Sequence, residues 1–195
     1  MIALGVLRHG TTAWNEEGRL QGRADAPLSA TGEAALQGRR LPAAFARAHI
    51  YCSPLGRARR TASLLGIADP IIEPRLIEMD WGAYEGRTLD ELRRAGALSA
   101  ANEGRGLDFC PPGGESPRAM QARLRAWLME VAARGEPAVA ITHKGVIRVL
   151  LTLAYGWDMT GRQPLKLDWR CLHTFHLQPD GSVRPGPCNI GLEAA

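Results

Sequence analysis

Three short apolar runs that end abruptly at polar or charged residues constrain the fold of this chain more than any other feature. The runs cover residues 2–7, 49–52 and 138–142. Each has the length and composition of a buried strand, and the last two lead directly into a helical pattern. Ligands of open α/β sheets bind beyond the carboxyl ends of parallel strands. If these strands are parallel neighbours, the residues that follow them meet in one pocket that suits a phosphate: Arg8, His9, Arg57 and His143.

Helical patterns separate the strand-like runs along the chain. We predict helices over residues 29–46, 54–65, 117–133 and 145–154, and short strands over 70–73, 171–177 and 182–184. Ser53 and Ser116 each precede a proline and are typical N-cap residues, and Gly66 is expected to end the second helix.

This alternation predicts an α/β fold, a three-layer sandwich with a mostly parallel central sheet and helices on both faces. The tail strands are expected to add an antiparallel edge. A chain of 195 residues is most simply one domain, residues 1–195. Residues 88–114, rich in glycine and proline turns, are expected to form an excursion that covers one side of the sheet.

Composition and charge argue against several classes of function. The apolar stretches are strand-sized, so we expect no membrane span, and no secretory signal shows at the start, so we expect a cytoplasmic protein. Lys and Arg number 24 against 20 Asp and Glu, but without a dense basic run we expect no nucleic-acid partner. The four cysteines form no C-x-x-C pair, which gives no support to zinc or thioredoxin-type chemistry.

Five sequence blocks in order resemble the histidine phosphatase superfamily, which has the phosphoglycerate mutase-like fold. The blocks cover residues 7–15, 53–62, 76–86, 114–116 and 142–148. A lone histidine at a strand end is more often a satisfied packing residue. Here two histidines repeat the pattern and the blocks span most of the chain, which favours a catalytic interpretation.

The resemblance implies a role for each charged residue in the pocket. His9 would be the nucleophile that forms a phosphohistidine, and Arg8, Arg57 and His143 would surround the phosphoryl oxygens. No metal or other cofactor would be required. Glu78 would be the general acid and base.

A second carboxylate, Glu85, also matches a family marker and competes with Glu78 for this role. We favour Glu78 because the family's proton donor precedes the Asp-Trp-Gly turn. Glu85 would then be a structural carboxylate that hydrogen-bonds the loop, and Asp80 a turn residue.

The rim of the pocket is less clearly marked. The resemblance implies that Asn15 donates to a phosphate oxygen and that Gln21 and Gly22 lie at the rim. Thr12 either binds substrate in the same way or bonds its own backbone. The chain departs from the family at Thr11, where Glu or Gln is usual, and at Lys144, where Gly is usual. Lys144 either favours an acidic substrate at the rim or reaches into solvent.

Three functions remain to be compared. The first is a phosphomonoesterase acting on a small phosphorylated metabolite. The second is a cofactor-dependent phosphoglycerate mutase, against which the short chain and the segment 19–22 argue. The third, a catalytically silent phosphate-binding protein, would require the loss of an essential group, yet all are present. The sequence leaves open whether the protein is a monomer or a homodimer.

Overall fold

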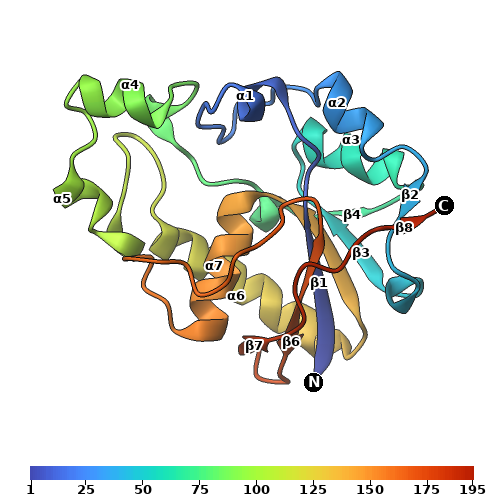
Figure 1. Ribbon diagram of the computed structural model, residues 1–195. Coiled ribbons are helices and arrows are strands. Elements are labelled where there is room, and N and C mark those ends of the chain that lie inside the picture. The colour runs from blue at the N-terminus through green and yellow to red at the C-terminus, as the bar shows by residue number, and fades with distance from the viewer.

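The computed structural model describes residues 1–195 and contains a six-stranded sheet in the order β4-β3-β5-β1-β6-β7 (Figure 1). The strands are β1 (Ile2–Arg8), β3 (His49–Cys52), β4 (Ile71–Ile72), β5 (Ala138–Thr142), β6 (Leu172–Leu177) and β7 (Val183–Pro185). The first four run parallel, whereas β6 and β7 form an antiparallel edge. This confirms the predicted fold class.

The strand register brings the ends of β1, β3 and β5 to one edge of the sheet. Arg8 of β1 lies opposite Thr142 of β5, and Cys52 of β3 lies opposite Ile141. The central strand β5 is buried at every residue, which explains its continuous apolar sequence. The polar segments that follow the three strands therefore meet at this edge.

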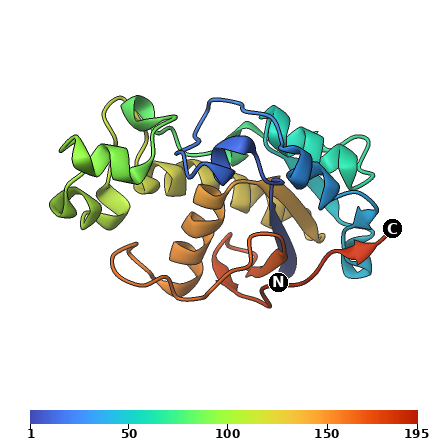
Figure 2. The same ribbon diagram turned by 45° about the horizontal axis from the view of Figure 1, so that its top comes forward.

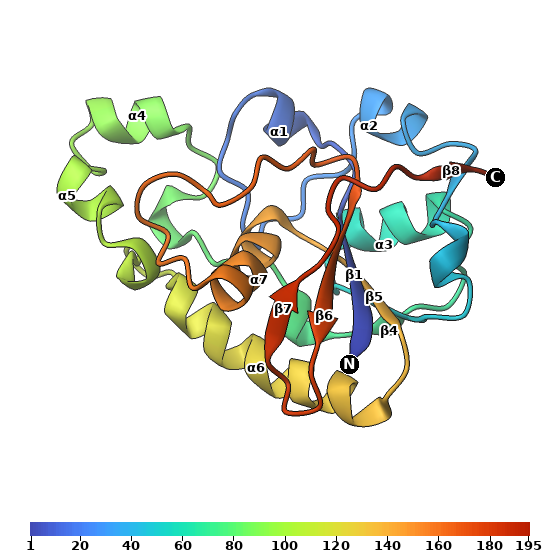
Figure 3. The ribbon, with the colours of Figure 1, turned by 60° about the horizontal axis from the view of Figure 1, so that its bottom comes forward.

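Helices cover both faces of the sheet. On one face, α6 (Pro117–Arg134) and α7 (Lys144–Tyr155) pack in the larger core cluster with Val6 and Ala140. The other face is covered by Leu36, which follows α2 (Ala30–Ala34), by a 3-10 turn (Ala43–Phe45) and by α3 (Gly56–Leu64). Figure 3 shows α6 and α7 beside the β6–β7 hairpin, with α3 beyond the sheet.

Local chemistry sets the ends of the long helices. The Ser116 hydroxyl caps α6 by accepting from the amide of Ala119, and Pro117 takes the first helical position, as predicted. Gly135 and Gly156 end α6 and α7 in the left-handed conformation, with φ of 73° and 66°.

The predicted helix over residues 29–46 is wrong. The only α-helix there is α2. A left-handed Gly38 (φ 65°) follows it, and then come the two-residue strand β2 (Arg39–Arg40) and the 3-10 turn Ala43–Phe45. Strand β2 pairs with β8 (Glu193–Ala194) at the end of the chain, a contact between distant segments that no local pattern announces.

The predicted start of the second helix also needs correction. Helix α3 begins at Gly56 with Leu55 as its N-cap, and Leu55 makes no side-chain capping bond. Ser53 is therefore not a cap. Gly66 does follow the helix in the left-handed conformation, with φ of 76°.

Residues 88–114 do not cover a face of the sheet. They form α4 (Leu89–Arg94), α5 (Ala100–Glu103) and a 3-10 turn (Gly106–Asp108), and their small core of Tyr84, Leu92 and Leu98 contains no strand residue. Figure 2 shows α4 and α5 (green) on the opposite side of the molecule from α2 and α3. None of the helices has both the length and the apolar character that crossing a bilayer requires.

Candidate active site

The His9 ring is fixed in one tautomer by its two neighbours. The strand hydrogen bond from its amide to the Thr142 carbonyl places it at the end of β1. Its Nδ1 lies 2.7 Å from the Gly10 carbonyl, which can only accept, so Nδ1 carries the proton. The Nε2 atom then holds a lone pair and accepts from Arg57 Nε at 3.3 Å. Burial, followed by the charges of Arg8 and Arg57, lowers the pKa of His9 well below its usual value, so the ring is neutral.

His143 stands beside His9, with 5.1 Å between the ring centroids and 56° between the ring planes. Its Nε2 lies 2.7 Å from the Ser53 hydroxyl, which itself accepts from the amide of Leu55. We assign the hydroxyl as the donor in this contact, because it already accepts from Leu55, and this assignment places the ring proton of His143 on Nδ1. That Nδ1 is buried and has no acceptor in the protein. Burial and the neighbouring charges lower the pKa of His143 well below its usual value, so it is a neutral donor.

Two arginines border the histidines, and their surroundings differ. Arg57 is 1% exposed and donates to the carbonyls of Ala24 at 2.8 Å and Gly22 at 2.7 Å. Asp25 accepts from it at 3.4 Å. Most of the guanidinium therefore holds the loop, and Nε faces His9. Arg8, in contrast, has a buried Nε with no hydrogen-bond partner.

Glu78 is almost fully buried, and both of its oxygens are held by backbone amides. One oxygen accepts from Met79 at 2.8 Å and the other from Gly145 at 3.0 Å, near the start of α7. A Cβ atom at position 145 would lie 2.1 Å from the carboxylate, so only glycine allows this approach. Burial raises the pKa of Glu78, against the lowering effect of these amides, Arg57 and Arg8.

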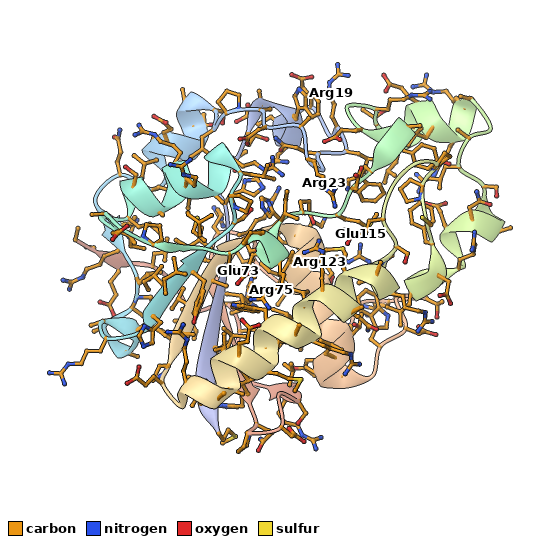
Figure 4. All side chains as sticks on the ribbon, turned by 180° about the vertical axis from the view of Figure 1, so that it is seen from behind. Arg19, Arg23, Glu73, Arg75, Glu115 and Arg123 are labelled. Carbon is orange, nitrogen blue, oxygen red and sulfur yellow. The ribbon has the colours of Figure 1, made fainter.

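Arg123 of α6 pins the backbone that leads into Glu78 (Figure 4). It donates to the carbonyl of Ile77 at 2.7 Å and also to that of Arg75. Glu115 binds it at 2.8 Å, and Figure 4 shows Arg23 on the far side of Glu115. Arg23 and Glu115 approach to 4.0 Å. This row of ion pairs connects the loop around Arg23 to the segment that carries Glu78.

Comparisons with known proteins decide the family. The model of the histidine phosphatase superfamily (branch 1) matches residues 4–184. This chain belongs to the histidine phosphatase superfamily.

Individual relatives agree with this membership. A probable phosphoglycerate mutase, GpmB, of Enterobacter sp. (strain 638) is 32% identical over 86% of this chain and 81% of its own length. The crystal structure of TTHB049 from Thermus thermophilus is 40% identical, covers 78% of this chain and 84% of that one, and has a TM-score of 0.61. The alpha-ribazole phosphatase of Shigella flexneri shares the fold, with a TM-score of 0.77 over 98% and 100% of the chains, at 23% identity.

Glu85 binds the loop that carries Gly22 and Ala24. Its carboxylate accepts from the amides of Gly22, at 2.9 Å, and Ala24. Asp80 accepts from the amide of Gly82, as a turn residue does. Asp80 also forms an ion pair with Arg23 at 3.2 Å. Glu78 accepts from backbone amides as well, but the charges of both Arg57 and Arg8 act on it.

The predicted rim residues bind one another. Thr12 is fully buried, and its hydroxyl donates to the Gln21 side chain at 2.8 Å while accepting from the amide of Asn15 at 3.2 Å. Of the two alternatives for Thr12, these bonds favour the one within the loop, because the hydroxyl proton goes to Gln21 and not to a substrate. The side-chain amide of Asn15 donates to Oε1 of Gln21 at 3.4 Å, and Nε2 of Gln21 donates to the carbonyl of Ala26 at 3.3 Å. Gly22 contributes backbone only, and a Cβ there would lie 2.6 Å from the Met79 carbonyl.

The two family departures lie in different settings. Lys144 is the first residue of α7, and its Nζ lies above Trp169, 5.3 Å from the ring centroid. Lys144 is exposed, and the contact with Trp169 holds its side chain along the protein surface without removing it from solvent. Thr11 supports α2 through its carbonyl, which accepts from the amide of Ser29 at 2.9 Å.

Sequence reasoning missed three residues of the site. Ser53, interpreted as a helix cap, orients His143, and its place directly after β3 was the available signal. Asp25 and Arg123 act through contacts with residues far away in the sequence, for which no local pattern exists.

Proposed function

We propose that this protein is a phosphomonoesterase that acts on a small phosphorylated metabolite through a phosphohistidine on His9. The observation that carries the proposal is the fixed tautomer of His9, which leaves a lone pair on Nε2 beside Arg57 and His143. A neutral imidazole with an available lone pair is the form that attacks phosphorus.

In the first step, Nε2 of His9 forms a bond to phosphorus as the bond from phosphorus to the leaving oxygen breaks. The electron pair of that bond goes to the leaving oxygen, and the proton of the Glu78 carboxyl group follows, so that an alcohol departs. The raised pKa of Glu78 supports this role, because the acid must hold its proton near neutral pH.

In the second step, water attacks the phosphohistidine. Glu78, now a carboxylate, takes a proton from the water, and the electron pair of the breaking P–N bond returns to Nε2. Inorganic phosphate leaves and both groups regain their starting states. Arg8, Arg57 and the Nδ1–H of His143 stabilise the charge on the phosphoryl oxygens in both transition states.

A mutase is the second candidate, because relatives such as the Enterobacter protein are named as probable phosphoglycerate mutases. A mutase must keep water away from its phosphohistidine. A chain of 195 residues leaves little insertion to close over the site, which supports hydrolysis.

The test is to trap the intermediate and identify the acceptor. Rapid mixing with an aryl phosphate, followed by quenching, should yield a protein that carries one phosphoryl group on the peptide containing His9. The His9→Asn variant should carry none and should release no phosphate, while its circular dichroism spectrum stays unchanged. Turnover by that variant would reject the mechanism.

A second measurement separates hydrolase from mutase. Incubation with 3-phosphoglycerate and a bisphosphoglycerate primer should release inorganic phosphate without rapid formation of 2-phosphoglycerate. Isomerisation that outpaces phosphate release would favour the mutase.

A further inference from the structure

Two basic side chains of α7, Lys144 and Arg148, lie next to the proposed phosphoryl pocket. They are four residues apart and so share one face of the helix, one turn from each other. Lys144 directly follows His143, so this face begins at the pocket. The Lys144 Nζ is 5.3 Å from the ring centroid of Trp169, and the Arg148 guanidinium is 5.2 Å from that of Trp157. The two indoles thus hold the two cations in defined positions.

Neither cation has an acidic partner, and the same is true of Arg8. Three other arginines of this region are paired. Arg57 is paired with Asp25, Arg75 with Glu73 and Arg123 with Glu115. Arg148 is half-buried, and its Nε atom is buried without any hydrogen-bond acceptor. A buried donor without a partner carries a desolvation cost that a bound acceptor would remove.

The positive charges on this wall also repel one another. Burial lowers the pKa of both Lys144 and Arg148, and the charges of Arg8 and Arg148 lower that of Lys144 further. Glu78 acts in the opposite direction on both groups. Arg8, Lys144 and Arg148 therefore lie close enough to interact, with a single shared carboxylate to offset three charges.

One phosphoryl group does not account for this surplus. Arg8, Arg57 and the Nδ1–H of His143 already supply donors for its three oxygens. Arg148 lies a full helical turn beyond Lys144 along α7, away from His143. An anion bound there must therefore be a different group from the one that His9 attacks.

We propose that Lys144 and Arg148 form a subsite for a second anionic group of the substrate, a carboxylate or a second phosphate. The inference rests on the proposed phosphatase function and narrows its substrate class to phosphomonoesters that carry such a group. The guanidinium of Arg148 supplies a planar fork that binds either group through two hydrogen bonds, and Lys144 supplies charge between the two anions.

The test uses pairs of substrates that differ only in the second anion. One pair is 3-phosphoglycerate and glycerol 3-phosphate, and another is glucose 1,6-bisphosphate and glucose 6-phosphate. In at least one pair, the wild-type protein should show a higher kcat/KM for the member with two anionic groups. The ratio should be about tenfold or more, as expected for a charge-assisted hydrogen bond.

The variants Lys144→Met and Arg148→Met keep the packing against the indoles and remove the charge. Each variant should reduce the preference for the member with two anionic groups, mainly by raising its KM. The loss of kcat/KM on the member with one anionic group should be much smaller. Arg184→Met is the matched control. Arg184 is exposed on β7 and, through His176, aligns with Ala3 near the start of β1, so it lies at the far end of the sheet from His9. The substrate preference of Arg184→Met should equal that of the wild type.

The outcomes distinguish a failure of the proposed subsite from a failure of the proposed phosphatase activity. Equal rates on both members of both pairs would overturn the subsite while leaving the phosphatase intact. Equal losses on both members in the variants would overturn it as well, because the cations would then serve the transferred phosphoryl group. Absence of phosphate release from any ester, aryl phosphates included, would instead reject the phosphatase itself.

Discussion

The two walls of the pocket use their positive charges differently. On the α7 wall, formed by the end of β1 and the first turns of α7, Arg8, Lys144 and Arg148 have no acidic partner of their own. On the loop wall, formed by residues 19–26 and the start of α3, Arg57 is paired with Asp25 and bound to two carbonyls. A paired cation fixes the backbone, whereas an unpaired one is available to an incoming anion. Arg57 therefore does both: its terminal nitrogens hold the loop and its Nε faces His9, whereas the guanidinium of Arg8 has no such structural task.

Each wall also carries one carboxylate that accepts from backbone amides. Glu78 binds Gly145 on the α7 wall, and Glu85 binds Gly22 and Ala24 on the loop wall. Glu78 is buried near Arg57 and Arg8, and burial raises its pKa, whereas Glu85 ties the loop together. Substitutions at these two positions give the sharpest test of the comparison.

The largest effect is expected for Glu78→Gln. The amide keeps the shape of the side chain but cannot transfer a proton, so kcat for alkyl phosphates should fall by about 10² to 10⁴. Aryl phosphates, whose leaving groups need less protonation, should lose less. Glu85→Gln should lower the melting temperature with a smaller effect on kcat. A larger loss of kcat in Glu85→Gln than in Glu78→Gln would assign the acid-base role to Glu85 and the structural role to Glu78.

The pH profile sharpens the same prediction. Glu78 must be protonated in the first step, and burial raises its pKa, so kcat/KM for alkyl phosphates should stay high until the pH rises through that raised value. His9 has a lowered pKa and stays neutral on the acid side. The decline at alkaline pH should disappear in Glu78→Gln. An unchanged decline would assign it to another group.

The next effect compares Arg8→Met with Arg57→Met. Both should lower kcat/KM by about 10² to 10³, as the loss of one preorganised donor does. Only Arg57→Met should also destabilise the fold, because the carbonyls of Gly22 and Ala24 lose their donor, at a cost of about 1–3 kcal/mol. Thermal unfolding distinguishes them. Equal destabilisation by both variants would remove the distinction between the walls.

This distinction also explains how much could be predicted from the sequence. Arg8 ends β1, and His9 and His143 directly follow β1 and β5. A parallel sheet brings such strand ends together without further information. The loop wall depends on contacts such as that of Asp25 with the amide of Gly56, across 31 residues. The predicted helix over residues 29–46 failed for a related reason, since β2 pairs with the end of the chain.

A smaller effect is expected for Arg123→Met, which removes the donor that holds Ile77 and leaves Glu115 half-paired. Glu78 would lose its fixed position, so kcat for alkyl phosphates should fall by about tenfold while KM changes little. The alkaline limb of the pH profile should move as well. Arg123→Lys, which retains the charge, should restore part of the lost kcat and part of the shift in the alkaline limb. A purely structural role would lower stability without moving the pH profile.

The smallest effect is expected for Ser53→Ala. Without the hydroxyl, His143 Nε2 has no partner and the ring proton can occupy either nitrogen, so the donor at Nδ1 is present only part of the time. We expect a loss of a few-fold in kcat/KM, smaller than for Arg8→Met because the ring itself remains. The ¹⁵N chemical shifts of the His143 ring should change from the Nδ1–H pattern to a mixture. Ser63→Ala, at an exposed position of α3, is the control and should change neither kcat/KM nor the ¹⁵N chemical shifts of His143. An unaltered tautomer in Ser53→Ala would mean that the α7 wall orients His143 without help from the loop that follows β3.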